Sequence, residues 1–415
     1  MRRVVITGMG CINSVATNTI EFKEALKNGV DGVKEISIFD TTNYRTNFAA
    51  QLADEDYEKA CNRYGLDKNQ LRIRNIVSIA CKEATGQSKI DFSSIDSQRA
   101  GISLATSLGG IDSIDKFLIA ENEENEENEE NEENLPDYTM YLDNCANLSG
   151  TIAKEYNLNG PFITVSTACA AGTNSIGAAL DMIRYGRADV MICGGADPIS
   201  RISVNGFNCL KSLSPSAKAR SFSQERDGLI IGEGAAIFVL EDLDSAKKRG
   251  ATILAEVLGY GLANDAYHMT SPDPKGGGAI RAMKSCLKDA KLEATDVQYI
   301  NAHGTGTQFN DAMETKALLT FFGEHAVNIP VSSIKGMVGH TLGAAGSVEF
   351  LAATLCITDN FLPPTINFGT PIKGFEDYDF VPNKSREVKI NYAISNSYAF
   401  AGNTASIAVG RYLEE

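Results

Sequence analysis

The sequence lacks several features that would each define a class of protein. No apolar run reaches the length needed to span a membrane, so we do not expect a membrane protein. The nine cysteines are odd in number and include no CxxC pair, which argues against a disulfide framework and a zinc site. The start, MRRVVITGMG, has no small-residue cleavage site, so we expect a first core strand rather than a signal peptide. These absences favour a protein of the reducing cytoplasm.

Positive charge is also scarce. The formal net charge of the 415 residues is −15 at pH 7, which argues against nucleic acid as a partner. Nine glutamates lie in one stretch without any basic residue, ENEENEENEENEEN at 121–134. This acidic tract repeats with a period of three, which matches neither a helix nor a strand, and its like charges repel. We interpret it as an exposed or disordered insertion, with a docking segment as the alternative.

Outside the tract, apolar runs typical of strands alternate with helical stretches, which predicts an α/β fold. Several runs are apolar throughout, as expected for strands that are covered on both faces. The predicted strands are 3–8, 162–166, 189–195, 235–242, 253–260, 297–302, 329–333, 392–397 and 405–410, and the predicted helices include 170–185, 279–292 and 342–357.

The chain also contains an internal repeat. ITVSTACAAGTNSIGAAL in the first half resembles IPVSSIKGMVGHTLGAAG in the second, each with a strand, a turn and a helix of small residues. ILAEVLGYGLANDA similarly resembles the opening RVVITGMGCINSVA. The chain is too long for one simple core, so we predict two related halves, 1–250 and 251–415. Matching strand ends would then converge on one site.

Cys169 lies where a predicted strand ends and a predicted helix begins. Unpaired N–H groups and the helix dipole gather at such a position, and both stabilise a thiolate. A buried packing cysteine is the alternative, but this context favours a nucleophile. Two of only four histidines, His303 and His340, lie at comparable junctions, and one cysteine with two histidines fits acyl transfer. We expect His268 to be supportive and His325 to lie in a surface loop.

Lys335 has the same offset in its repeated strand motif as Cys169 has in its own, four residues after the valine of VSS and of VST. A lysine at that depth needs a counter-charge, and Glu349 in the next helix is the expected partner. A solvated surface pair is the alternative. Candidate oxygen ligands of a structural monovalent cation are Asn301, Glu314 and Asn396.

Motifs along nearly the whole chain resemble those of the β-ketoacyl-[acyl-carrier-protein] synthases, above all the elongating synthase II type. In chain order they are VSTACAAG, RSFSQERDGLIIGEGAAIFVLED, GYGLANDAYHMTSPDP, INAHGTGTQFNDAMET, VSSIKGMVGHTLGAAGSVE, LPPTINF and ISNSYAFAGNT. The resemblance implies a thiolase-type fold, whose duplicated halves form five layers, α-β-α-β-α. It also implies a homodimer, with a heterodimer that includes a chain-length-type subunit as the alternative.

The resemblance implies a decarboxylative Claisen condensation in fatty-acid elongation, an acyltransferase reaction without a catalytic cofactor. Cys169 would take an acyl chain from the 4′-phosphopantetheine arm of acyl carrier protein as a thioester. His303 and His340 would bind the malonyl thioester as carbon dioxide leaves. The resulting enolate would attack the acyl-cysteine and give a 3-ketoacyl-[acyl carrier protein].

Further roles follow from the same resemblance. The backbone N–H groups of Cys169 and Phe400 would form the oxyanion hole, and Phe400 would also gate the site. Lys335 and Glu349 would set the electrostatics, with Asp265 in support. The remaining implied contacts are Thr305 and Thr307 for the phosphopantetheine arm, Leu108 for the acyl pocket, and Lys68, Arg72, Arg74, Lys211 and Arg220 for carrier-protein docking.

The sequence departs from the family pattern in two places. The gating loop usually reads G-F-G-G-T-N after N-S-F, but here it is AFAGNT after NSY. Ala399 and Ala401 replace glycines, so loop states with positive φ cost more, and we expect a stiffer gate with an altered acyl preference. The acidic tract occupies a region where the family commonly has basic residues that meet acidic carrier protein. It either loops away from the docking face or tunes partner choice.

Three other interpretations remain. A ketosynthase of a type II polyketide or polyene pathway uses the same catalytic residues, and the altered gate keeps this interpretation open. A biosynthetic thiolase would show a second cysteine-centred site, which is not visible. A non-catalytic partner subunit would lack the nucleophile, whereas Cys169, His303 and His340 are all present.

Overall fold

A ten-stranded mixed sheet forms the centre of the molecule. The computed structural model describes residues 1–111 and 145–414, so the acidic tract lies outside the described residues. The strand order is β10-β9-β13-β14-β8-β1-β7-β6-β4-β5. The first half of the chain supplies β1 (Val4–Asn13), β4 (Ala100–Ala105), β5 (Phe162–Val165), β6 (Val190–Asp197) and β7 (Gly234–Asp242). The second half supplies β8 (Ala255–Asn264), β9 (Tyr299–Asn301), β10 (Val331–Ser332), β13 (Tyr392–Tyr398) and β14 (Asn403–Gly410).

The two halves of the sheet have the same pairing pattern. From its outer edge, each half has two parallel pairings followed by two antiparallel ones, β5-β4-β6-β7-β1 in the first half and β10-β9-β13-β14-β8 in the second. The halves join where β1 pairs with β8, over Val4–Ile6 and Ala255–Val257 only. The sheet is therefore a duplicated unit with a short junction.

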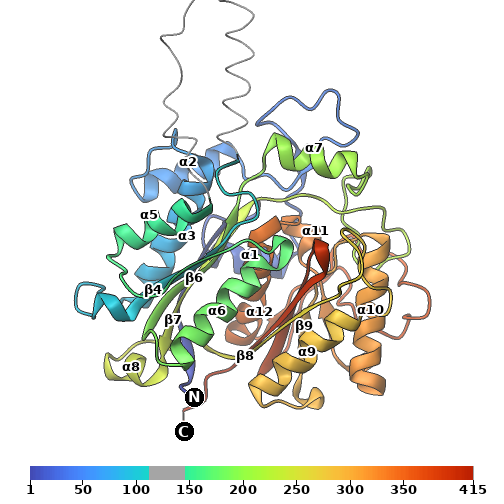
Figure 1. Ribbon diagram of the computed structural model, residues 1–415. Helices are drawn as coiled ribbons and strands as arrows, with labels where there is room; N and C mark the ends of the chain where they lie inside the picture. Colours follow the sequence, from blue (N-terminus) through green and yellow to red (C-terminus); the bar gives the residue numbers. More distant parts are fainter. Residues whose placement is uncertain (112–144, 415) are drawn as a thin grey trace, which may run out of the picture.

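Helices cover both faces of each half-sheet. Two helices, α6 (Ala171–Arg184) and α12 (Ala345–Asp359), lie between the half-sheets and contact strands of both (Figure 1). The outer helices are α3 (Arg72–Ser88) and α5 (Cys145–Glu155) on the first half, and α9 (Gly277–Ala290) and α10 (Gln308–Phe322) on the second. The predicted order of five layers, α-β-α-β-α, is confirmed.

Smaller elements surround this core. The remaining helices of the described chain include α1 (Thr19–Asn28), α2 (Asp54–Arg63), α7 (Arg201–Cys209), α8 (Leu243–Lys248) and α11 (Lys335–Val338). Two two-stranded sheets are formed by β2 (Lys34–Glu35) with β3 (Phe48–Ala49), and by β11 (Phe361–Leu362) with β12 (Arg386–Glu387).

The sequence predicts no apolar run long enough to span a membrane, but one helical stretch reaches that length. Among the described residues, Leu342–Asp359 has the length and hydropathy of a membrane span, but 89% of it is buried inside the protein. A helix that is apolar on all sides is the usual composition for one that is covered on all sides. α12 is such a helix because the two half-sheets and α6 enclose it.

The two halves do repeat the same strand, turn and helix, but the predicted alignment of Lys335 with Cys169 is wrong. Short 3₁₀ turns precede both central helices, Ala168–Ala170 (η4) before α6 and Leu342–Ala344 (η7) before α12. The first residue of each turn has positive φ, 49° at Ala168 and 51° at Leu342. Cys169 therefore corresponds to Gly343 rather than to Lys335. The second half carries an extra segment, 334–341, before its turn, and this segment holds Lys335 and His340.

Candidate active site

Cys169 lies at the junction of β5 and α6, inside the turn η4. Its side chain is 8% exposed and lines a cavity of about 320 Å³. The turn requires positive φ at Ala168, which costs a non-glycine residue about 1–2 kcal/mol. Strain of this kind is common where a chain presents a functional group. The neighbouring Gly172 allows close packing, because a Cβ there would lie 2.6 Å from the backbone nitrogen of Ser347.

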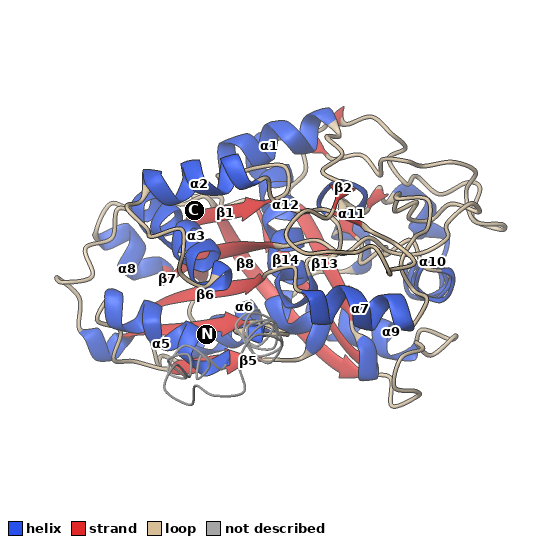
Figure 2. Cartoon of the chain, turned by 90° about the horizontal axis from the view of Figure 1, so that it is seen from above, coloured by secondary structure: helices blue, strands red, loops and turns tan. Residues whose placement is uncertain are grey.

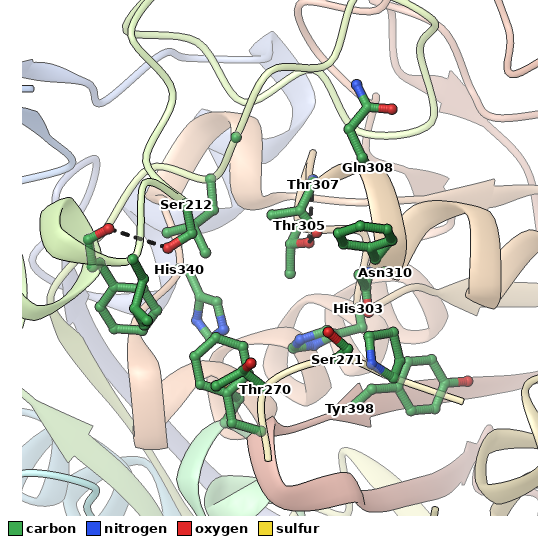
Figure 3. A pocket seen from close by; sticks show the side chains of 18 of the residues that line it. Ser212, Thr270, Ser271, His303, Thr305, Thr307, Gln308, Asn310, His340 and Tyr398 are labelled. Atoms are coloured by element: carbon green, nitrogen blue, oxygen red, sulfur yellow. Dashed lines mark hydrogen bonds between the residues drawn. The ribbon is translucent and has the colours of Figure 1, made fainter. Parts of the chain in front are cut away.

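The two histidines reach the same cavity from the second half of the chain. His303 follows β9, and His340 follows α11. Their ring centroids are 5.3 Å apart at an interplanar angle of 86°, and both line the cavity together with Cys169. Figure 3 shows the two rings side by side in the cavity. The structure thus brings the three predicted side chains together from distant parts of the sequence.

The hydrogen bonds of the histidines define their tautomers. The backbone N–H of Leu342 donates to Nδ1 of His340 at 3.1 Å, and Nζ of Lys335 lies 3.3 Å from Nδ1 of His303. Because each Nδ1 accepts, the proton of each ring is on Nε2. Burial, followed by the positive charge of Lys335, holds the pKa of both histidines well below the usual value. The site therefore has two neutral imidazoles with Nε2–H donors.

Lys335 and Glu349 form the buried pair that the sequence predicts. The side chain of Lys335 is 1% exposed, and its Nζ donates to Glu349 and to the carbonyl of His303. A solvated surface pair is excluded by this burial. Burial raises the pKa of Glu349 to about 7 against the opposing effect of Lys335.

Burial also has the largest effect on the pKa of the Cys169 thiol. It raises the pKa of Cys169 to about 11, although the Lys335 charge and the backbone N–H groups of Phe400 and Cys169 favour the thiolate. The N–H groups at the start of the helical turn favour the thiolate, as expected from the sequence, but burial outweighs them. The two N–H groups lie beside the sulfur, the atom that would carry the acyl group, and the predicted oxyanion hole would use them as donors to the acyl carbonyl oxygen.

The gating loop lies against two neighbouring segments. The ring of Phe400 stacks on Phe207 of α7 with centroids 5.8 Å apart. Ala401 has φ 60°, and its N–H donates to the carbonyl of Met269 at 2.7 Å. Ala399 has φ −110°, an extended conformation without a penalty. The two alanines therefore differ, since only Ala401 is strained in this state of the loop.

Other predicted residues fall into two groups. Asp265, Thr305 and Thr307 line the cavity, and the two threonine hydroxyls hydrogen-bond at 2.9 Å (Figure 3). The carboxylate of Asp265 accepts backbone N–H bonds from the following loop and the start of α9. Leu108 lies in the turn after β4 and does not line this cavity.

The predicted docking bases have different environments. Lys211 is exposed and lines the cavity at its open side. Lys68 and Arg220 are paired with nearby acids, and Arg74 is half-buried. Arg72 is a correction, because its guanidinium makes two bonds of 2.8 Å to the fully buried carboxylate of Glu233. That carboxylate needs a counter-charge, so Arg72 does not offer its charge to a carrier protein.

The three candidate cation ligands do not meet. Asn301 is the sheet partner of Ser395, and the next residue, Asn396, points to the opposite face because side chains alternate along a strand. Oδ1 of Asn396 accepts from Ser406, and the Glu314 carboxylate accepts the N–H groups of residues 303 and 304. Oδ1 of Asn301 is buried without a partner. The described residues also include no cluster of three or more His, Cys, Asp or Glu that could hold a metal.

The other two histidines lie outside the cavity. His268 is exposed, and its Nδ1 accepts the N–H groups of Thr270 and Ser271, so it supports the loop beside the gate. His325 is half-buried in the 3₁₀ turn Gly323–Asn328.

Two residues near the site were not singled out from the sequence. Asp311 is buried and accepts the N–H groups of Thr305 and Gly306, so it fixes the loop of the predicted phosphopantetheine contacts. Tyr398 lines the cavity with its ring 5.8 Å from His303, and its buried hydroxyl has no hydrogen-bond partner. Asp311 stands within the motif INAHGTGTQFNDAMET, and Tyr398 is the tyrosine of NSY, so both signals were in the sequence.

Comparison with known proteins agrees with this geometry. Family models described as "Beta-ketoacyl synthase, N-terminal domain" and "Beta-ketoacyl synthase, C-terminal domain" match residues 1–246 and 254–369. The chain is 38% identical to 3-oxoacyl-[acyl-carrier-protein] synthase 2 of Coxiella burnetii, over 100% of this chain and 99% of that protein. It is 37% identical to the protein of the same name from Staphylococcus aureus, over 99% of both chains.

Solved structures show the same fold. The ishigamide ketosynthase/chain length factor superposes with a TM-score of 0.90 and 34% identity, over 99% of this chain and 100% of that chain. A beta-ketoacyl synthase from Burkholderia phymatum has a TM-score of 0.86 and 31% identity, over 100% of both chains. A type II polyketide ketosynthase in complex with its acyl-carrier protein has a TM-score of 0.89 and 32% identity, over 99% of this chain and 100% of that chain. The chain belongs to the beta-ketoacyl synthase family.

Proposed function

We propose that the protein condenses an acyl chain held on Cys169 with malonyl-[acyl carrier protein], releasing carbon dioxide and 3-ketoacyl-[acyl carrier protein]. The observation that carries this proposal is the meeting of one thiol and two neutral imidazoles in a cavity of about 320 Å³. The relatives named 3-oxoacyl-[acyl-carrier-protein] synthase 2 support the same reaction and a role in fatty-acid elongation.

The first step is acyl transfer to the thiol. The sulfur of Cys169 attacks the thioester carbonyl of the acyl carrier, the bond to the carrier's thiol breaks, and the proton ends on that thiol. The backbone N–H groups of Cys169 and Phe400 stabilise the oxyanion of the tetrahedral intermediate. Loss of one such donor typically costs about 10²–10³ in rate. The donors matter here because burial disfavours the free thiolate.

The second step uses the histidines. The Nε2–H groups of His303 and His340 donate to the thioester carbonyl of the malonyl group, and the bond to its carboxylate breaks as carbon dioxide leaves. The enolate is held by the same two donors and attacks the acyl carbon on Cys169. The new carbon–carbon bond forms as the carbon–sulfur bond breaks, and the thiolate takes up a proton. Burial, followed by the charge of Lys335, keeps both rings neutral by lowering the pKa of each histidine.

The carrier protein brings both substrates, so we propose no catalytic cofactor. Thr305 and Thr307 line the cavity where the phosphopantetheine arm would enter. Lys211 at the open side of the cavity is the docking base that its position supports best, with Lys68, Arg74 and Arg220 as further candidates. All nine cysteines are free thiols, which fits the reducing cytoplasm.

A homodimer is the proposed assembly, and β5 is its contact strand. β5 is at an edge of the sheet (Figure 2), and Phe162 at its start is 50% exposed. Carbonyls of residues 161 and 165 accept from Ile102 of β4 and from Thr106, the residue after β4, so the backbone polar groups of 162 and 164 point outward. An unpaired strand edge of this kind is a template for a second strand. A heterodimer with a chain-length-type subunit would use the same edge, and the halves 1–250 and 251–415 are the proposed domains.

A second candidate is a ketosynthase of a type II polyketide or polyene pathway. The departures at Tyr398, Ala399 and Ala401 favour it, because all three surround the gate. It differs from the first candidate in what happens after one condensation, since a polyketide synthase extends the ketone product again.

Intact-mass analysis of carrier-bound products separates these functions. The protein is incubated with malonyl-loaded carrier and a panel of acyl primers, beside the Cys169→Ala variant. A single two-carbon extension supports fatty-acid elongation, and repeated extension supports the polyketide pathway. The acyl adduct should be absent in Cys169→Ala. No acyl adduct on the wild-type protein would contradict both functions and favour a non-catalytic subunit.

A further inference from the structure

Asp197, the last residue of β6, has a buried carboxylate with four donors around it. Its side chain is fully buried. It accepts the hydroxyl of Thr106, the N–H of Ser107 at 2.9 Å, the N–H of Leu108 at 3.1 Å, and the N–H of Gly343 at 2.6 Å. Three of these donors come from the turn after β4, and the fourth comes from η7 in the other half of the chain.

The carboxylate links the two sides of the proposed reaction. The turn 106–109 carries Leu108, the predicted acyl-pocket residue, and Thr106 closes it by accepting the N–H of Gly109 at 2.9 Å. The other segment, η7, begins at Leu342, whose N–H defines the tautomer of His340. Asp197 is therefore one residue removed from the donor that orients a histidine of the cavity.

The packing around Gly343 shows that this link is tight. A Cβ on Gly343 would lie 2.5 Å from the nitrogen of Ser107 and 2.7 Å from Oδ2 of Asp197. A Cβ on Gly195 would also lie 3.1 Å from the carbonyl oxygen of Gly343. The turn and η7 therefore touch through backbone atoms, with the carboxylate between them.

We propose that Asp197 is a positioning residue that holds the acyl-pocket turn and the His340 segment in register with each other. One carboxylate then fixes both the turn of Leu108, the acyl-pocket residue implied by the resemblance, and the His340 side of the cavity. Without it, the backbone donors of the two segments face one another with no acceptor, and the segments separate. The proposal rests on the proposed function for its catalytic consequence, but the link between the segments does not depend on any substrate.

Asp197→Asn is the first test. The amide has nearly the same shape, but either orientation places its NH₂ group among four donors. We expect acylation of Cys169 by acyl carrier and decarboxylation of malonyl carrier both to slow by about 10²-fold, the loss typical of a misplacement by about 1 Å. Wild-type rates in both half-reactions would overturn the proposal.

Substitutions of Thr106 test the turn after β4 separately from the His340 segment. Thr106→Val keeps the shape but removes the hydroxyl that donates to Asp197 and accepts from Gly109. We expect it to change the acylation rate and its chain-length preference by about 10-fold and to leave malonyl decarboxylation unchanged, because the bond to Gly343 remains. Thr106→Ser restores the hydroxyl and should restore the preference. The matched control is Thr354→Val in α12, which removes a buried hydroxyl that bonds to Phe350. It should lower Tm without changing the ratio of the two half-reactions.

Hydrogen exchange gives a readout that needs no substrate. In Asp197→Asn the amides of 106–109 and of 342–344 should both exchange faster than in the wild type, and in Thr106→Val only those of 106–109 should do so. Unchanged exchange in both variants overturns the proposal, even if the wild-type protein proves inactive. If the wild-type protein is inactive but the variants exchange faster than it does, the link between the segments is supported and the proposed function is contradicted. If Asp197→Asn does not fold, the Thr106 variants alone decide.

Discussion

At the scale of single residues, burial sets the protonation state of the groups in the cavity. It raises the pKa of the Cys169 thiol and lowers the pKa of His303 and His340, so acid and base both stay neutral. The nearby charge of Lys335 acts in two directions, since it favours the thiolate but disfavours the imidazolium. The reaction proposed here therefore depends on N–H donors that meet developing charge rather than on ions that are present beforehand.

The thiol makes this testable through its reaction with iodoacetamide. Burial disfavours the charged form, so a thiol with a pKa of about 11 is ionised to about one part in 10³ at pH 8, against about one part in 10 for a thiol with the ordinary pKa of 9.0. We expect the alkylation rate of Cys169 to rise about tenfold per pH unit up to about pH 10. Peptide mass mapping distinguishes it from the exposed Cys209, the internal control for the reagent. A plateau below pH 9 would contradict the dominance of burial.

At this scale, the sequence could predict the role of a residue when the residue lies in a recognisable motif, but not when its partner is far away in the chain. Cys169, His303 and His340 each lie in a recognisable motif, so their meeting could be expected. The role of Arg72 could not, because Glu233 is 161 residues away and only the fold shows that its carboxylate is buried. The cation ligands failed through strand parity, since a shift of one residue moves a side chain to the other face.

At the scale of elements, the two central helices cross at a pair of glycines. A Cβ on Gly172 would lie 2.6 Å from the nitrogen of Ser347, and one on Gly346 would lie 2.6 Å from the nitrogen of Thr173. The contacts are reciprocal, as expected for duplicated halves. The sequence repeat showed these helices correctly but matched Lys335 with Cys169, because each stands four residues after the valine of a repeated VS pair, Val331 and Val165. Only the paired turns reveal that 334–341 is an addition.

Gly346→Ala should disturb this crossing. The added methyl would also lie 2.2 Å from Oγ1 of Thr173, and overpacking of this kind costs about 1–3 kcal/mol. We expect Tm to fall in thermal unfolding. The matched control is Gly86→Ala, near the end of α3, where a Cβ meets no atom within 4 Å. That variant should gain about 0.5–1 kcal/mol from helix propensity. An equal response of Tm to both substitutions would contradict the close crossing.

The gating loop gives a second test at this scale. Ala401 is strained at φ 60°, so Ala401→Gly should raise Tm by relieving about 1 kcal/mol in the observed state. Ala399 is unstrained, so Ala399→Gly leaves that state unchanged but opens positive-φ states of the loop. We expect it to speed acylation of Cys169 by long acyl chains. Acylation rates over a series of chain lengths measure this. Unchanged rate and selectivity in the double variant would show that the gate is not stiffened.

At the scale of the whole molecule, the acidic tract dominates the charge. Removal of 121–134 changes the net charge from −15 to −6. We expect the deletion to lower the KM for acyl carrier protein at about 0.01 M salt, where the Debye length is about 30 Å, and to matter less at about 0.15 M, where it is about 8 Å. Replacement of the nine glutamates by glutamine controls for length. An unchanged KM in both variants would mean that the tract does not affect docking.

The duplicated sheet is symmetric in its pairing but not at its edges. β10 ends the second half and is buried, whereas β5 ends the first half and is partly exposed along its length. Equivalent strands therefore differ in how far they are covered. Sequence patterns predicted both strands but could not distinguish these environments, because the cover comes from segments far away in the chain. They missed β4 (AGISLA) entirely, because glycine and serine interrupt its apolar residues.

The exposed edge predicts how the dimer can be broken. Thr164 directs its backbone N–H outward, so Thr164→Pro removes a donor from the edge without removing a bond to β4. We expect the dimer to dissociate, as measured by sedimentation equilibrium. Thr164→Val is the matched control: it also loses the hydroxyl bond to Ser149 but keeps the N–H, so its dimer should persist. Equal dissociation of the two variants would assign the effect to the side chain. If the wild-type protein is monomeric and assembles only with a chain-length-type subunit, the homodimer is wrong and a heterodimer uses this strand.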